Sequence, residues 1–294
     1  MSSHDLDPPR GHNFLGLTND ESAYDAARVV IVPVAYDATT SYKSGTKDGP
    51  AAIIAASREI ESTDRDAGPD SAELGLHTCD EVEAEVDGPA IMVAKVEREI
   101  GRHLDAKKYC VMLGGEHSLT AAAVRAHKSR YPDLSVLQID AHADMRDTYQ
   151  GSKHSHATVM RRVREICPAV SVGIRSASKV CLKEITDQNL PIFWARDCIG
   201  RSDWHDRAID HLSNDVYLTF DLDGFDPSIM PSVGTPEPGG LLWYETIAFL
   251  KTVASQRRIV GFDVVELMPI PGIHHSDFTA ARLVTELLRM TQSL

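Results

Sequence analysis

The chain has 294 residues, which is enough for one large α/β domain or for two smaller ones with a sizeable core. It carries 30 Lys and Arg residues against 43 Asp and Glu residues, and this net charge of −13 argues against nucleic acid as a partner and favours the attraction of cations. Its five cysteines lack a Cys-x-x-Cys pair and indicate neither a disulfide framework nor a zinc knuckle. A polar amino-terminal stretch without a long apolar run predicts a cytoplasmic protein that does not enter membranes.

In chain order, residues 1–25 are expected to form an N-terminal arm and residues 26–294 a single domain of alternating strands and helices. The predicted strands cover residues 28–33, 109–113, 134–139, 169–173, 192–194, 216–220 and 259–266. The predicted helices cover residues 50–61, 89–105, 118–130, 157–166, 244–254 and 276–290, and polar loops are expected at 36–45, 64–71 and 227–240. Seven or eight alternations without a repeat favour one α/β domain with a mostly parallel sheet.

The stretch from Leu134 to Asp144 carries the strongest functional pattern. Its apolar first half predicts a buried strand, and Asp140, His142 and Asp144 then follow at every second position. Side chains at alternate positions of an extended segment point to one side, so the three groups converge where the strand leaves the sheet. This is the edge at which open α/β proteins bind ligands.

Other polar residues also stand at the ends of predicted strands: His117, Asp221, Asp223 and Glu266. Carboxylates gathered at one edge repel one another and resist ionisation unless cations are bound, and two divalent ions resolve the conflict. Four carboxylates with two imidazoles favour manganese over zinc or magnesium and leave nickel and cobalt open. A lone histidine such as His103 or His127 is expected to be an ordinary buried side chain with its hydrogen bonds satisfied.

Four motifs resemble, in the same order, those of the ureohydrolase family of arginases, agmatinases and guanidinobutyrases. They are Gly114–Ser118, Asp140–Asp144, Ser155–Thr158 and Asp221–Pro227, and further similarity covers residues 37–41, 234–240 and 279–281. The resemblance implies a three-layer α/β/α fold, two Mn²⁺ ions per subunit, release of urea from a small cationic guanidino substrate, and a homotrimer or homohexamer.

The resemblance also implies a ligand set. The first metal would be held by His117, Asp140, Asp144 and Asp221, and the second by Asp140, His142, Asp221 and Asp223. Asp140 and Asp221 would therefore bridge the two ions. Each of these positions carries the residue type that the family uses.

The expected reaction is attack of a metal-bridging hydroxide on the guanidinium carbon, since guanidinium is a poor electrophile and needs a strong nucleophile. The departing amine needs a proton, for which Asp144 is the expected first carrier and His156 resembles the family's proton shuttle. Glu266 would accept hydrogen bonds from the guanidinium nitrogens and orient them.

The substrate is harder to predict. Arginases carry an Asn-x-His-Gly pattern where this chain has His154-Ser155-His156-Ala157, which disfavours arginine. An acidic chain suits agmatine, so the preferred activity is hydrolysis of agmatine to putrescine and urea. Guanidinobutyrate, with His274 and His275 as cations for its carboxylate, and aminopropylagmatine are the alternatives, together with arginine itself.

Two other classes stay open: a single-zinc deacetylase and a non-catalytic regulatory relative. Arg175 is expected to be structural, pairing with a carboxylate or bracing a subunit contact. His154 is assigned to a loop or to the rim of the site, and His274 with His275 to the cap of the following helix in preference to the substrate.

Overall fold

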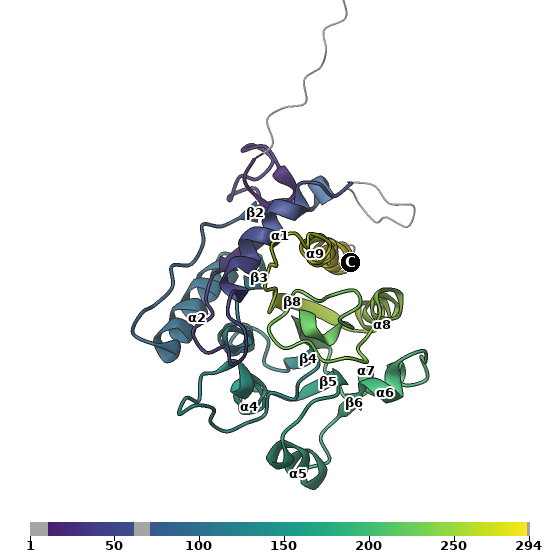
Figure 1. The fold of residues 1–294 in the computed structure, drawn as a ribbon. Helices are drawn as coiled ribbons and strands as arrows, with labels where there is room; N and C mark the ends of the chain where they lie inside the picture. The colour runs from purple at the N-terminus through teal and green to yellow at the C-terminus, as the bar shows by residue number, and fades with distance from the viewer. Residues whose placement is uncertain (1–10, 62–70, 293–294) are drawn as a thin grey trace, which may run out of the picture.

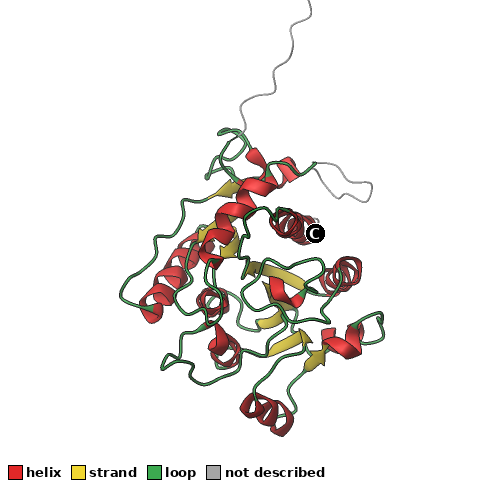
Figure 2. Cartoon of the chain, viewed as in Figure 1, coloured by secondary structure: helices red, strands yellow, loops and turns green. Residues whose placement is uncertain are grey.

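The structure is a computed structural model that describes residues 11–61 and 71–292. Within this part of the chain eight strands form one sheet, with helices on both of its faces (Figures 1 and 2). The strand order is β2-β1-β3-β8-β7-β4-β5-β6, and each pair of neighbours is parallel. The predicted α/β class is confirmed, and a sheet predicted to be mostly parallel is parallel throughout.

The elements have the following bounds. The strands are β1 Val29–Val34, β2 Leu76–Thr78, β3 Tyr109–Gly114, β4 Ser135–Ile139, β5 Ala169–Ile174, β6 Ile192–Trp194, β7 Asp215–Asp221 and β8 Arg258–Val265. The α-helices are α1 Gly49–Ser57, α2 Pro89–Asp105, α3 Thr120–Lys128, α4 Val159–Arg164, α5 Lys179–Asp187, α6 Ala195–Cys198, α7 His205–Ile209, α8 Trp243–Gln256 and α9 His275–Gln292. The 3₁₀ turns are η1 Phe14–Gly16, η2 Thr46–Asp48, η3 Ser71–Leu74, η4 His117–Leu119, η5 His156–Thr158 and η6 Leu222–Gly224.

The two faces of the sheet bury separate cores because alternate strand residues point to opposite sides. In β1, Val29 and Ile31 belong to the core under α8 and α9, whereas Val30 and Val32 belong to the core under α2, α3 and α4. In Figure 1, α2 and α4 lie on one side of the strands and α8 and α9 on the other. A parallel sheet buried on both faces explains why its strands read as continuous apolar runs.

Each predicted strand and helix is observed with somewhat different bounds, and the structure adds the helices α5, α6 and α7, which were not predicted. The three-residue strand β2 was not predicted, because so short a run has no readable period. The helix predicted from residue 118 begins as η4, in which Ser118 donates a hydrogen bond to Glu116, and α3 begins at Thr120. The helix predicted from residue 157 begins as η5 and becomes α-helical at Val159. The loop predicted at 64–71 lies, up to residue 70, outside the described residues.

Residues 11–25, the described part of the predicted arm, contact the sheet and α2. Phe14 is fully buried in the core under α8 and α9, and the Tyr24 hydroxyl lies 2.9 Å from His103 Nδ1. The division of the chain at residue 25 stays a prediction. In the described ranges no helix is both long and apolar enough to cross a membrane.

Candidate metal centre

The carboxyl end of β3 delivers His117 to the edge of the sheet. The chain passes so close to the neighbouring loop at Gly115 that a Cβ there would lie 2.0 Å from the Tyr36 carbonyl oxygen, which only glycine avoids. His117 then opens η4 with its side chain fully buried. This sharp turn places an imidazole over the ends of the central strands.

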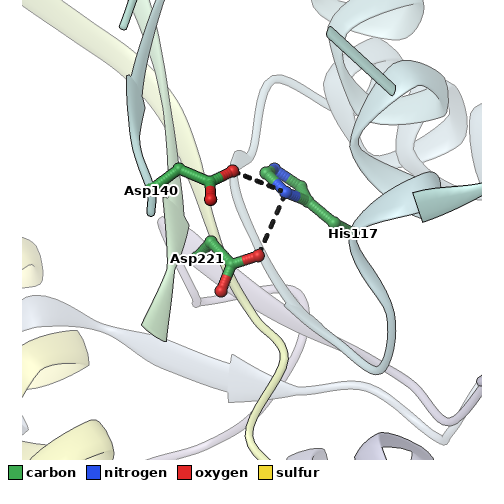
Figure 3. A group of neighbouring side chains, drawn as sticks. All are labelled: His117, Asp140 and Asp221. Atoms are coloured by element: carbon green, nitrogen blue, oxygen red, sulfur yellow. Dashed lines mark ion pairs between the residues drawn. The ribbon is translucent and has the colours of Figure 1, made fainter. Parts of the chain in front are cut away.

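Asp140 and Asp221 meet this imidazole from two neighbouring strands. Asp140 directly follows β4 and Asp221 ends β7, and the register of the two strands pairs the residues that precede them. Figure 3 shows both carboxylates pointing at the His117 ring. His117 Nδ1 lies 3.2 Å from Asp140 Oδ2, 3.2 Å from Asp221 Oδ2 and 3.4 Å from Asp144 Oδ2.

A second group lies on the other side of Asp140. His142 Nδ1 is 2.9 Å from Asp223 Oδ2 and 3.8 Å from Asp140 Oδ1. Two groups of three side chains, each with its ligand atoms within 4.8 Å of one another, are suited to metal ions: His117 with Asp140 and Asp221, and Asp140 with His142 and Asp223. Because Asp140 belongs to both, the two groups form one site for two ions.

The predicted ligand set is brought together with two differences in its inner geometry. Asp144 faces His117 but is not a member of the first compact group, and Asp221 is not a member of the second. Asp144 adopts a positive φ of 48°, a conformation that non-glycine residues rarely take and that is enriched at functional sites. The roles of the individual ligands stay predictions.

The protonation energetics show that this cluster suits cations. Burial and the neighbouring carboxylates raise the pKa values of Asp140 and Asp221 above their ordinary range. Burial lowers the pKa of His117, but its contacts with Asp140, Asp144 and Asp221 outweigh burial and hold that pKa well above the ordinary value. His117 Nδ1 has no hydrogen-bond partner among the described residues, and a metal ion that displaces its proton would bind to that nitrogen.

The other half of the site is already an ion pair. Burial lowers the pKa of His142, but the Asp223 carboxylate outweighs it and raises the pKa to about 11. Burial acts to raise the pKa of Asp223, but His142 holds it below its ordinary value. The oxygen and nitrogen donors of the whole cluster fit Mn²⁺, Co²⁺ or Ni²⁺ better than Mg²⁺.

A cavity of about 170 Å³ opens over the cluster. Asp144, His156 and Glu266 line it together with His142, Asp221 and Asp223. Further residues that line it are Ser41, Arg146, Tyr149, Ser176, Ser178, Cys181 and Thr235. The three residues predicted to act on the substrate therefore share one cavity with three further predicted metal ligands.

Glu266 lies directly beyond β8 at a positive φ of 67°. Its Oε1 accepts a hydrogen bond from the His117 backbone N–H at 2.6 Å, which ties it to the metal cluster. Burial and the charges of Glu116 and Asp223 raise the pKa of Glu266 well above its ordinary range, although the hydrogen bond from His117 opposes them. A buried carboxylate held in this way is suited to a cationic ligand.

His156 is positioned by a chain of hydrogen bonds that starts at a buried carboxylate. Glu116 accepts from the Thr39 backbone N–H and from the Thr39 hydroxyl, each at 2.6 Å. The Thr39 hydroxyl in turn accepts from the His156 backbone N–H at 3.0 Å. The side-chain Nε2 of His156 is buried and has no partner within the described ranges, so it is available to a proton.

The remaining candidates lie outside the cavity. His154 and the exposed pair His274 and His275 are not among the residues that line it, and α9 begins at His275. Arg175 is structural, as predicted, but its partners are not carboxylates. Its guanidinium donates to backbone carbonyls of Gly173, Asp223, Gly224, Phe225 and Glu237.

Several residues around the cluster were not predicted. They are Thr39, Gln138, Tyr217, Thr219 and Asp263. Gln138 donates to Asp140 Oδ2 at 2.6 Å and Thr219 lies 2.9 Å from His117 Nε2. The available signal was a polar residue two positions before a predicted ligand inside an apolar strand, since both then face the same side.

Comparisons with known proteins agree with this geometry. The model of the arginase family matches residues 27–289. The N(1)-aminopropylagmatine ureohydrolase of Synechocystis sp. is 40% identical over 278 residues, covering 91% of this chain and 90% of that protein. The agmatinase of Pyrococcus horikoshii is 33% identical over 267 residues, covering 90% and 92%. The solved structure of proclavaminate amidino hydrolase from Streptomyces clavuligerus aligns with a TM-score of 0.87 at 28% identity, covering 99% of both chains.

Proposed function

The chain belongs to the arginase family and is a ureohydrolase that acts on linear amidines, and from this premise we propose that it hydrolyses N1-aminopropylagmatine to urea and the free triamine. The choice of this substrate rests on the 40% identity, over 91% of the chain, to a protein named for that activity. Agmatine, the substrate preferred from the sequence, becomes the second choice, because the agmatinase compared above is 33% identical.

The reaction itself rests on one observation: two His and Asp groups share Asp140 beneath a cavity that also contains Glu266. We assign His117, Asp140, Asp144 and Asp221 to one Mn²⁺, and Asp140, His142, Asp221 and Asp223 to the other. Two bound ions supply a nucleophilic hydroxide at neutral pH. The subunit is expected to act in a homotrimer or homohexamer in the cytoplasm.

Glu266 orients the guanidinium. Its Oε1 is held by the His117 N–H, which leaves Oε2 and the remaining lone pairs for two guanidinium N–H groups. The same bond fixes the distance between the carboxylate and the metal cluster. A guanidinium bound by Glu266 would lie close to the residues that would hold the two metal ions, which would supply the nucleophile.

Asp144 and His156 handle protons. Asp144 lies at the floor of the cavity beside His117, where it accepts the proton released during the attack. Burial lowers the pKa of His156, so the ring is neutral at pH 7 and can receive that proton. Its unpaired Nε2 then delivers the proton to the departing amine, which leaves as the neutral amine.

A second candidate substrate is 4-guanidinobutyrate, and one specific residue favours it. Arg146 is exposed and lines the cavity, with its guanidinium 5.3 Å from the centre of the Tyr149 ring. A cation there attracts a carboxylate tail and repels an ammonium tail. The hydroxyls of Ser176 and Ser178, which line the same cavity, can instead accept hydrogen bonds from an amine.

The test is urea release by manganese-loaded protein from N1-aminopropylagmatine, agmatine, 4-guanidinobutyrate and arginine, with metal-free protein as the control. We expect aminopropylagmatine to exceed the others by about two decades in kcat/KM, roughly 2.7 kcal/mol in transition-state binding. A comparable lead for agmatine or guanidinobutyrate would reassign the substrate. Protein that binds two ions and releases no urea would overturn the activity.

The variant Arg146→Met gives an independent answer through its sign. If the tail is cationic, removal of the Arg146 charge should raise kcat/KM several-fold, because a repulsion is lost. If the tail is a carboxylate, the same variant should lower kcat/KM by about tenfold. The matched control Arg201→Met removes an exposed cation from a residue that does not line the cavity.

A further inference from the structure

A row of buried polar side chains lies behind His117, on the side away from the carboxylates. Thr219 Oγ1 lies 2.9 Å from His117 Nε2 and donates to Asp263 Oδ1 at 2.7 Å. The Tyr217 hydroxyl donates to the other oxygen of Asp263 at 2.9 Å. All four side chains are essentially inaccessible to solvent.

Sheet register brings this row together. Thr219 of β7 pairs with Asp263 of β8, so their side chains stand next to each other on one face. Tyr217, Thr219 and Asp221 alternate along β7 and therefore share that face. The strand that provides a predicted metal ligand also provides the two hydroxyls behind the histidine.

The hydrogen-bond directions in the row follow from counting protons. The Thr219 hydroxyl has one proton, and the Asp263 carboxylate can only accept it. Thr219 Oγ1 must therefore accept from His117 Nε2, which puts the ring proton on Nε2. Nδ1 is then the nitrogen left for a metal ion, which would replace its proton, and it is the atom that faces Asp140 and Asp221.

We propose that Thr219 and Asp263 are positioning residues that fix the tautomer and the ring orientation of His117, so that Nδ1 binds the first metal ion. This inference rests on the metal site assigned above. Metal-binding histidines commonly donate their second N–H to a carboxylate or carbonyl. Here the Thr219 hydroxyl lies between the imidazole and the carboxylate. Its hydrogen bond to Asp263 fixes the hydroxyl, which in turn fixes the imidazole.

The burial of Asp263 supports a specific role over simple packing. Burying a carboxylate inside a strand costs free energy unless other groups pair with its charge or donate hydrogen bonds to it. In the part of the chain that the structure describes, no Lys or Arg forms an ion pair with Asp263, and its hydrogen bonds come from hydroxyls. The row of hydrogen bonds runs from Asp263 through Thr219 to the His117 imidazole.

The experiment compares Thr219→Val with Thr219→Ser in the full-length protein, using calorimetric titration of the metal-free form with Mn²⁺ and Co²⁺. Valine keeps the shape of threonine and loses the hydroxyl, so the metal site that contains His117 should weaken by 10- to 100-fold. Serine keeps the hydroxyl and should stay within about threefold of the parent protein. Asp263→Asn should weaken the same site by about tenfold, and it tests the proposal should the valine variant fail to fold.

The control is Thr285→Val, which removes a buried hydroxyl that donates to the Ala281 carbonyl in α9. It should lower the melting temperature and leave metal affinity unchanged. Unchanged affinity in Thr219→Val, or equal losses in Thr219→Ser and Thr219→Val, would overturn the positioning role. If the parent binds two ions without releasing urea, the activity fails and the metal affinities still decide this proposal. If it binds no ion, both fail.

Discussion

Two fully buried histidines, His103 and His117, each lie within 3.2 Å of a carboxylate oxygen, yet their surroundings differ. His103 is saturated: Nδ1 pairs with the Tyr24 hydroxyl, and Nε2 lies 3.1 Å from Glu99 Oε1 and 3.5 Å from Cys79 Sγ. His117 has one saturated nitrogen and one that faces three carboxylates. Proximity of histidine to acid is common to both regions, but an incomplete set of hydrogen bonds belongs to one.

The charges around the two histidines also differ. Burial and the Arg102 guanidinium lower the pKa of His103, and the hydrogen bond from Arg102 lowers the pKa of Glu99. The acid there has a cation of its own. At the other site burial and mutual repulsion raise the pKa values of Asp140 and Asp221. A cluster of this kind gains from a metal ion, whereas the cluster around His103 is complete without one.

The largest test of this difference is Asp221→Asn. Urea release should fall by at least three decades, about 4 kcal/mol, because a predicted ligand of both ions is lost. The asparagine keeps an oxygen for the Asp223 N–H that Asp221 Oδ1 accepts at 2.9 Å. Since one of the repelling charges is gone, the metal-free variant should melt a few degrees above the metal-free parent, at about 2–4 °C per kcal/mol.

Metal analysis and calorimetry of both forms check this prediction. If the variant keeps two ions and full activity, the proposed difference between the surroundings of His103 and His117 is wrong. The same holds if the metal-free variant melts below the parent, because repulsion among the carboxylates would then not limit stability.

Glu266→Gln separates substrate orientation from metal binding. The amide keeps an oxygen for the His117 N–H and loses the charge that pairs with guanidinium. We expect kcat/KM to fall by two to three decades, about 3–4 kcal/mol, with both metal ions retained. Kinetics and metal content measured on the same preparation decide it, and a loss of metal would place Glu266 among the groups that maintain the cluster.

The sequence alone predicted that Asp140, His142 and Asp144 would gather at the edge of the sheet. Asp140, His142 and Asp144 alternate directly after an apolar strand, and the α/β pattern makes the ends of parallel strands meet. The inner supports were not predictable in the same way. Thr219 and Asp263 stand inside apolar strands, and they touch because β8 lies between β3 and β7. Nothing in chain order announces that neighbourhood.

The same limit explains the partners of Arg175. Arg175 was expected to pair with a carboxylate or to brace a subunit contact. Instead the loops after β7 present their carbonyls to its guanidinium, including those of Asp223 and Phe225. The direction of loop carbonyls depends on backbone torsions and cannot be derived from residue types.

His127 adds a third buried histidine, without a carboxylate beside it. Its Nδ1 donates to the Ala123 carbonyl at 2.8 Å, and burial lowers its pKa to about 4. The unfolded chain takes up this proton near pH 6.5 and the folded protein near pH 4. The contribution to stability is therefore complete above pH 6.5 and is lost as the pH falls to 4, by about 3 kcal/mol.

Denaturant unfolding between pH 7 and pH 4 measures this loss as the difference between the parent and His127→Asn, whose amide can still donate to Ala123. The variant should lack about 3 kcal/mol of the pH dependence. Equal slopes would mean that His127 takes up its proton at the same pH in the folded and the unfolded state. Burial would then affect the pKa of a histidine less than the comparison of His103 with His117 assumes.

The smallest expected effect belongs to Glu99→Gln. Glu99 is partly exposed, and its contacts with Arg102 and His103 should contribute no more than about 1 kcal/mol to the free energy of unfolding. Urea release and metal content should match those of the parent, because the residue does not line the cavity over the metal cluster. A change in metal content would mean that the His103 cluster also binds an ion, and incomplete hydrogen bonding would then no longer distinguish the two sites.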